Sequence, residues 1–281
     1  AIYTGTTSSA ASDVYKRQDL DLAAERRLLA QSTLRIASPE PASTQEWRAL
    51  VAGGFPGRLL LIVDTPPERG PHQDQPVQLA ESLLSRIDRT ETDLLLVSAY
   101  FIPTEPLTEA LRRATERGVR VRVLTNSLGS NNHVTAHASY AHHRPELLRA
   151  GVELYELRAD ASDRARYIFS AAEDSALGLH AKFALFDDCC LFVGSSNLDP
   201  RSLRINTEVG ALVDSPDLNR QMREFFAVDL LPQNAWRVRL AEDGSLMWEG
   251  GEGAVYDAPP ASFFMRAESW FFGLLPIESQ M

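Results

Sequence analysis

Apolar positions along the chain follow two different spacings. Continuous or alternating apolar runs predict strands, whereas apolar residues that recur every three to four positions predict helices. Strands are expected at 58–64, 94–101, 119–125, 152–157, 179–186, 190–194 and 208–214. Helices are expected at 77–89, from Pro106 to about 117, at 133–149 with a break near Pro145, and at 218–231.

This order of strands and helices, with one tight hairpin at 179–194, indicates an α/β fold. We expect a sandwich in which a mixed β-sheet is flanked by helices on both faces. Residues 232–281 add two short strand-like pieces near 236–240 and 246–248, and then an apolar, helix-like segment at 262–278. That segment is either a closing helix packed on the core or one whose aromatic side chains enter a lipid boundary.

The beginning of the chain differs in character from the rest. Residues 1–18 show neither a signal peptide nor an amphipathic pattern, and they resemble translated adaptor sequence or a disordered tail. A short helix at 19–31 and a linker rich in Pro, Ser and Gly follow. We therefore expect a tail at 1–18, a helix and linker at 19–56, and a catalytic domain at 57–281.

Charge and cysteine content restrict the class of protein. The 281 residues carry a net charge of −10, so there is no basic excess of the kind that nucleic-acid binders use. No apolar run reaches the 18 residues or so that a membrane-spanning helix needs. Cys189 and Cys190 are adjacent in what reads as a strand, where neighbours face opposite sides, so no disulfide between them is expected.

One group of polar residues has the composition and spacing of a functional site. His180, Lys182 and Asp187 are spaced H-x-K-x4-D, and the polar loop with Ser195 and Asn197 follows. Period-two geometry points His180 and Lys182 into the same space, and Asp187 falls in the turn between the two strands. An imidazole, an ammonium and several neutral donors together favour a phosphate site.

This spacing resembles the HKD motif of the phospholipase D superfamily. The continuation LDPRS at 198–202 and NTE at 206–208 resembles the cardiolipin synthase branch. SAYFIP at 98–103, GVRVRVLTNSL at 118–128, AGVELYEL at 150–157 and GLLPIES at 273–279 are similar to C-type bacterial enzymes. The resemblance covers about residues 75–281, most of the chain.

The resemblance implies a mechanism without a metal or other cofactor. In the superfamily, two HKD motifs face each other. One histidine forms a phosphohistidine, and the other moves protons to and from the alcohols. It implies catalytic roles for His180, Lys182, Asp187 and Glu208, with Glu208 orienting the imidazole and Asp187 acting structurally, and phosphate contacts for Ser195 and Asn197.

Other side chains are weaker candidates. A substrate cleft could include Tyr100, Asn126, His137, Tyr140 and Arg201, although Arg201 could equally hold a carboxylate, and Tyr100 and Asn126 could be ordinary loop packing. His133 and His137 are four residues apart, which would suit a metal on one helical face. No third ligand is evident in the sequence.

The sequence departs from the superfamily in carrying one H-x-K-x4-D rather than two. We therefore expect the C-terminal half of a cardiolipin synthase-like phosphatidyltransferase, inactive alone. Its acceptor would be phosphatidylglycerol, and the donor phospholipid, for which phosphatidylethanolamine is one candidate, stays open. Its partners would be an N-terminal HKD half or a homodimer mate, and a membrane surface. We expect the protein to lie peripherally on the cytoplasmic face of a bacterial inner membrane. Nucleic acid is not expected as a partner. The alternatives are a homodimeric single-motif phosphodiesterase and a non-catalytic binding module.

Overall fold

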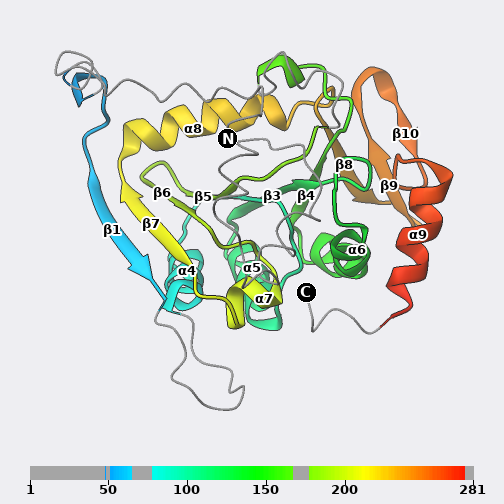
Figure 1. Cartoon of the computed structure of the whole chain (residues 1–281), viewed down its shortest axis with the longest axis horizontal. Helices are drawn as coiled ribbons and strands as arrows, with labels where there is room; N and C mark the ends of the chain where they lie inside the picture. The colour runs from blue at the N-terminus through cyan, green and yellow to red at the C-terminus, as the bar shows by residue number, and fades with distance from the viewer. Residues whose placement is uncertain (1–47, 49–50, 65–77, 167–176, 276–281) are drawn as a thin grey trace, which may run out of the picture. The chain divides into compact units, whose positions relative to one another are not determined.

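A computed structural model describes residues 48, 51–64, 78–166 and 177–275 of the chain (Figure 1). Two compact units are present. The larger contains residues 56–281, and the smaller spans 6–55, of which only residue 48 and residues 51–55 are described. The helix expected at 19–31 lies outside the described residues. All elements discussed below belong to the larger unit.

One ten-stranded sheet with the order β1-β7-β6-β5-β2-β3-β4-β8-β9-β10 forms the centre of this unit. The β2–β3 and β3–β4 pairs are parallel, and the other neighbouring pairs are antiparallel, which confirms the mixed sheet. The strands are β1 (Arg58–Val63), β2 (Asp93–Ser98), β3 (Arg120–Asn126), β4 (Glu153–Leu157), β5 (Lys182–Phe186), β6 (Cys190–Gly194), β7 (Val209–Asp214), β8 (Ala235–Leu240), β9 (Leu246–Glu249) and β10 (Val255–Tyr256).

Helices cover both faces of the sheet, as the apolar pattern predicts (Figure 1). One face carries α4 (Gln78–Asp88), α5 (Glu105–Glu116), α6 (Val134–Arg149) and the short α7 (Pro200–Arg204), and the other carries α8 (Pro216–Asp229). The last helix, α9 (Phe263–Gly273), packs beside α6. Short 3-10 turns lie at Arg164–Arg166 and Gly251–Gly253. A buried apolar cluster lies under each layer of helices.

The topology brings three chain segments to one edge of the sheet. Because β2 and β3 are parallel, their carboxyl ends lie at the same edge. Antiparallel β5 begins at that edge, where Lys182 is paired with Ser98. The HKD histidine and lysine therefore lie next to the segments that follow β2 and β3.

Some expected elements differ in the structure. Helix α6 continues without a break through Pro145. Packing compensates for the hydrogen bond that proline cannot make, because Arg144 and Leu147 are buried on either side of it. The strand expected at 179–186 begins at Lys182, since the backbone of Leu179 bonds to a side chain, Asn126, instead of to a neighbouring strand.

The expectation for the cysteines was wrong. A disulfide joins Cys189 to Cys190 in the structure. Cys189 lies in the turn that precedes β6, so the alternation of strand side chains does not separate the two sulfur atoms.

Candidate active site

His180 and Lys182 form the centre of the candidate site. The Lys182 ammonium Nζ lies 3.4 Å from His180 Nε2 and donates a hydrogen bond to the His180 backbone carbonyl at 3.0 Å. His180 is exposed and Lys182 is half-buried. The two side chains therefore point into the same accessible space, as period-two geometry predicts.

Their surroundings shift the protonation equilibria of both groups. Although the residue keeps exposed surface, partial desolvation of the His180 ring, followed by the Lys182 charge, lowers the pKa of His180 below its ordinary 6.5. Burial also lowers the pKa of Lys182, while the carboxylates of Glu208 and Asp199 act in the opposite direction. Desolvation and the Lys182 charge both favour the neutral imidazole of His180, the state that can attack phosphorus or accept a proton.

Asn126 holds the segment that carries His180. Its side-chain amide Nδ2 donates to the carbonyls of Leu179 and Ala99, each at 2.9 Å, and its Oδ1 accepts from the Leu179 amide at 2.8 Å. One buried side chain therefore replaces a strand partner for Leu179. Asn126 thereby holds Leu179, which precedes His180, next to Ala99, which precedes Tyr100.

Ser195 and Glu208 lie together on neighbouring strand ends. The Ser195 hydroxyl donates a short hydrogen bond to Glu208 Oε2, and the Asn206 amide donates to Glu208 Oε1 at 3.1 Å. Glu208 is buried, and its charge acts on Lys182. Within the described residues no hydrogen bond joins Glu208 to His180. Its expected role in orienting the imidazole remains a prediction.

Asn197 lies in the loop after β6, which is fixed to the end of β2. The Leu198 amide donates to Ser98 Oγ at 3.0 Å, and the Leu198 carbonyl accepts from the Ile102 amide at 2.7 Å. The side-chain Oδ1 of Asn197 is buried and has no hydrogen-bond partner in the described structure. A buried polar atom of this kind can be satisfied by a ligand or a water molecule.

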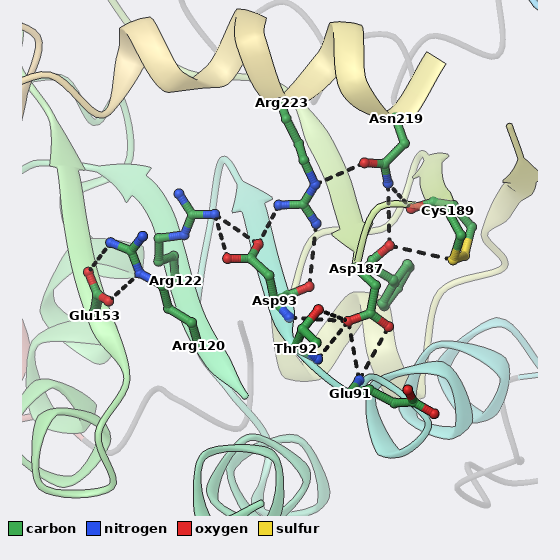
Figure 2. A network of polar contacts seen from close by, with 12 residues as sticks. Glu91, Thr92, Asp93, Arg120, Arg122, Glu153, Asp187, Cys189, Asn219 and Arg223 are labelled. Carbon is green, nitrogen blue, oxygen red and sulfur yellow. Dashed lines mark hydrogen bonds and ion pairs between the residues drawn. A yellow bond between two sulfur atoms is a disulfide. The ribbon is translucent and has the colours of Figure 1, made fainter. Parts of the chain in front are cut away.

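Asp187 lies at the opposite end of β5, about 16 Å from Lys182 at the rise of an extended strand. Its carboxylate accepts hydrogen bonds from the Thr92 amide at 2.7 Å, the Thr92 hydroxyl at 2.8 Å and the Asp93 amide at 3.1 Å (Figure 2). It also accepts from the Glu91 amide at 3.2 Å. Burial would raise the pKa of Asp187, but these hydrogen bonds outweigh it and lower the pKa below 3.8. This geometry gives Asp187 a structural role.

Two of the candidate cleft residues lie near the centre of the site. The Tyr100 hydroxyl donates to Asn132 Oδ1 at 2.8 Å. Burial raises the pKa of Tyr100, the hydrogen bond to Asn132 opposes the shift, and the Asp199 charge adds to it. Arg201 is exposed, and its Nε donates to Asn206 Oδ1 at 3.3 Å. Arg201 thus reaches Glu208 indirectly, through Asn206.

His137 and Tyr140 are buried, so neither side chain faces open space. His137 Nε2 lies 2.6 Å from the Arg144 guanidinium, which stacks over the Tyr140 ring at 4.5 Å. Burial and then the Arg144 charge lower the pKa of His137 well below its ordinary 6.5, so its Nε2 accepts a hydrogen bond from Arg144. No group of three His, Cys, Asp or Glu among the described residues is arranged to hold a metal.

The chain is similar to a known protein family. A family described as cardiolipin synthase, phospholipase D-like domain matches residues 83–230, more than half of the 281 residues. The chain belongs to this phospholipase D-like family. This membership confirms the resemblance that the HKD spacing indicates.

The family includes synthases that are longer than this chain. Cardiolipin synthase C of Escherichia coli K12 is 32% identical over 249 residues, which are 87% of this chain and 47% of that protein. Cardiolipin synthase B of the same strain is 28% identical over 164 residues, 54% of this chain and 35% of that protein. The chain therefore spans less than half of either synthase. Among solved structures, the phospholipase D family member Nuc from Salmonella typhimurium is 17% identical, with a TM-score of 0.47, and covers 66% of this chain and 99% of Nuc.

One residue that sequence reasoning missed holds the backbone of Glu208. Asp64 follows β1 and is buried. Its Oδ2 accepts from the Glu208 amide at 3.0 Å, and its backbone amide donates to the Glu208 carbonyl at 2.9 Å. The sequence signal for Asp64 was its position as an acidic residue directly after the apolar run RLLLIV, because functional side chains are commonly found where strands end.

Proposed function

We propose that this chain supplies half of the active site of a cardiolipin synthase-like phosphatidyltransferase. The observation that carries the proposal is the pairing of the His180 imidazole with the Lys182 ammonium at 3.4 Å, on the edge of the sheet where Ser195 and Glu208 also lie. Membership of the cardiolipin synthase, phospholipase D-like family supports the same reaction class.

The proposed reaction uses two histidines. One imidazole nitrogen attacks the phosphorus of a phospholipid, and the phosphorus–oxygen bond to the leaving alcohol breaks as that alcohol takes a proton from the second histidine. The primary hydroxyl of phosphatidylglycerol then gives its proton to the second histidine, attacks phosphorus and releases the first. Lys182 would stabilise the charge that develops on the phosphoryl oxygens, with Ser195 and Asn197 contributing further contacts. His180 supplies one of the two histidines.

The second histidine must come from elsewhere, because the sequence carries one HKD motif. We propose that an HKD segment of a longer protein provides it, as the partial coverage of the synthases suggests, and that the chain alone has little activity. A second copy of this chain is the other source that would complete the site.

Phosphatidylglycerol is the proposed acceptor, and phosphatidylglycerol or phosphatidylethanolamine the proposed donor. Both lipids reside in bilayers, so we propose peripheral attachment to the cytoplasmic face of a bacterial inner membrane. In the described part of the chain, no helix is long and apolar enough to cross a membrane.

The test is lipid analysis after incubation of vesicles with the 281-residue chain and with the product of its complete gene. We expect the complete product to form cardiolipin from phosphatidylglycerol, and His180→Ala to reduce the rate at least a thousandfold. Arg220→Ala, at an exposed residue of α8 on the other face of the sheet, is the control and should leave the rate unchanged. Phosphatidic acid without cardiolipin would favour a phosphodiesterase. Cardiolipin formation that persists in His180→Ala would overturn the proposal.

A further inference from the structure

Helix α9 has an inner side that packs on α6. Met265, Ser269, Phe272 and Gly273 are half-buried and lie on that side. The Ser269 hydroxyl lies 3.2 Å from His137 Nδ1, and Gly273 lies beside His142. Only part of the circumference of α9 is therefore used to pack the helix on the rest of the fold.

The remaining circumference is an exposed apolar ridge. Phe263 is 71% exposed, Phe264 82%, Trp270 68%, Phe271 55% and Leu274 64%. At about 100° per residue these side chains, with Ala267 and Leu275, span an arc of about 140°. Glu268 and Arg266 lie at the two borders of this arc, and no charged residue lies within it.

The ridge is as large as the largest apolar patch of a typical soluble monomer, and such patches are often functional. A fully buried aromatic side chain removes about 200 Å² from water, so the four exposed rings present about 500 Å² of surface. Contiguous apolar patches of this size mark interaction sites on soluble proteins.

We propose that α9 docks this chain on a phospholipid bilayer, lying in the interface plane with the ridge inserted among the lipids. The helix is about 16 Å long, so it can lie along a membrane surface but cannot cross it. Phe, Leu and Trp are the side chains that such helices insert, and tryptophan favours the boundary. The choice of lipid as the occupant rests on the proposed function, in which both substrates are phospholipids.

The area of the ridge supports a bilayer over a second copy of the chain. Stable dimers bury about 800 Å² on each partner. A copy that met this convex ridge would cover only the side turned toward it, whereas a bilayer takes in the whole arc. The net charge of −10 opposes attraction to anionic lipid, so apolar area must drive the binding. We expect the affinity to change less than twofold between low and high salt.

Helix α6 connects the ridge to the candidate site. It packs against α9, and His133, the residue before α6, contacts the Tyr100 ring with 5.3 Å between centroids. Docking through α9 would therefore also fix the orientation of the sheet edge that holds His180 relative to the lipid surface.

Co-sedimentation with vesicles of phosphatidylcholine, with and without phosphatidylglycerol, tests the proposal. Using the full chain with His180→Ala separates binding from turnover, so a failed transferase assay does not affect the result. We expect Phe264→Ser with Trp270→Ser to weaken partitioning at least tenfold. Leu60→Ser with Leu61→Ser, which replaces apolar side chains that are 61% exposed on β1, is the matched control and should not change it.

A second readout locates the helix in the bilayer. Vesicles with brominated acyl chains should quench the fluorescence of Trp270, and Trp270→Phe should lose that quenching while still sedimenting with lipid. Equal partitioning of the α9 double variant and the parent chain would overturn the proposal. So would a concentration-dependent dimer in light scattering that disappears with Phe264→Ser, because the ridge would then bind a second copy.

Discussion

The protonation state of His180 depends on its neighbour two residues along the chain. The Lys182 ammonium lies 3.4 Å from His180 Nε2, and a cation at that distance disfavours a second positive charge. Burial acts in the same direction and has the larger effect. Lys182 thus has two effects at one site: it places a cation beside the imidazole, and it lowers the pKa of that imidazole. In the proposed function the same cation would contact the substrate phosphate.

Replacing Lys182 with Met should raise the pKa of His180, because the repulsive charge is removed while burial remains. The imidazole would then protonate at a higher pH than in the parent chain, moving toward its ordinary 6.5. NMR titration of the His180 ring protons measures this shift. Arg201→Met, which removes a more distant cation, should leave the midpoint nearly unchanged. A midpoint that falls in Lys182→Met would contradict the electrostatic origin of the shift.

At the scale of elements, one carboxylate joins the turn between β5 and β6 to the start of β2. Asp187 has φ = 46°, a left-handed conformation that Asp and Asn tolerate better than most residues. Its hydrogen bonds to Thr92 and Asp93 join this turn to the start of β2 (Figure 2). The H-x-K-x4-D spacing therefore combines residues from the two ends of one strand.

Asp187→Ala should destabilise the fold by about 2–3 kcal/mol, through lost charged hydrogen bonds and an unfavourable backbone conformation. Because the folded-state pKa of Asp187 is lowered, its contribution is present above the unfolded value of about 3.8 and is lost as the pH falls below it. Urea unfolding at several pH values measures both effects. Asp187→Asn keeps the turn and should lose less stability. Catalysis of folded enzyme at 25 °C should be unchanged, and a large fall in turnover would indicate a chemical role.

The sequence was sufficient to predict which segments are helices and which are strands. The residues at which they begin and end depend on side-chain hydrogen bonds, which the hydrophobic periodicity does not describe. The strand expected at 94–101 ends at Ser98, where the Ser98 hydroxyl bonds to the Tyr100 carbonyl at 2.7 Å and to the Leu198 amide. In the site, the pairing of His180 with Lys182 follows from spacing alone. The clamp of Asn126 on Leu179 could not be predicted, since the two residues are 53 positions apart.

At the scale of the whole molecule, one buried ion pair connects the central sheet to the C-terminal strands. Arg144 Nε donates to Glu156 Oε1 at 2.7 Å, and Trp248 Nε1 donates to Glu156 Oε2 at 3.0 Å. Arg144 and Glu156 are both almost fully buried. Helix α6, β4 and β9 therefore share a single polar centre, in which each charge depends on the other.

Arg144→Met should lower the free energy of unfolding by about 3–5 kcal/mol, because it leaves the Glu156 carboxylate buried without its cation. Urea unfolding measures the loss. Adding Glu156→Gln to Arg144→Met should recover part of it, since the uncompensated charge is then removed. Greater destabilisation in the double variant than in Arg144→Met would contradict this account.

Strand β1 has a practical consequence for handling the protein. In the described structure it is the outermost strand next to β7, and Leu59, Leu60, Leu61 and Val63 on it are more than half exposed. An apolar edge with free backbone groups is a template for further strands, and such edges promote aggregation during expression and refolding. A lysine in place of Leu60 would act as a gatekeeper and should increase the soluble yield.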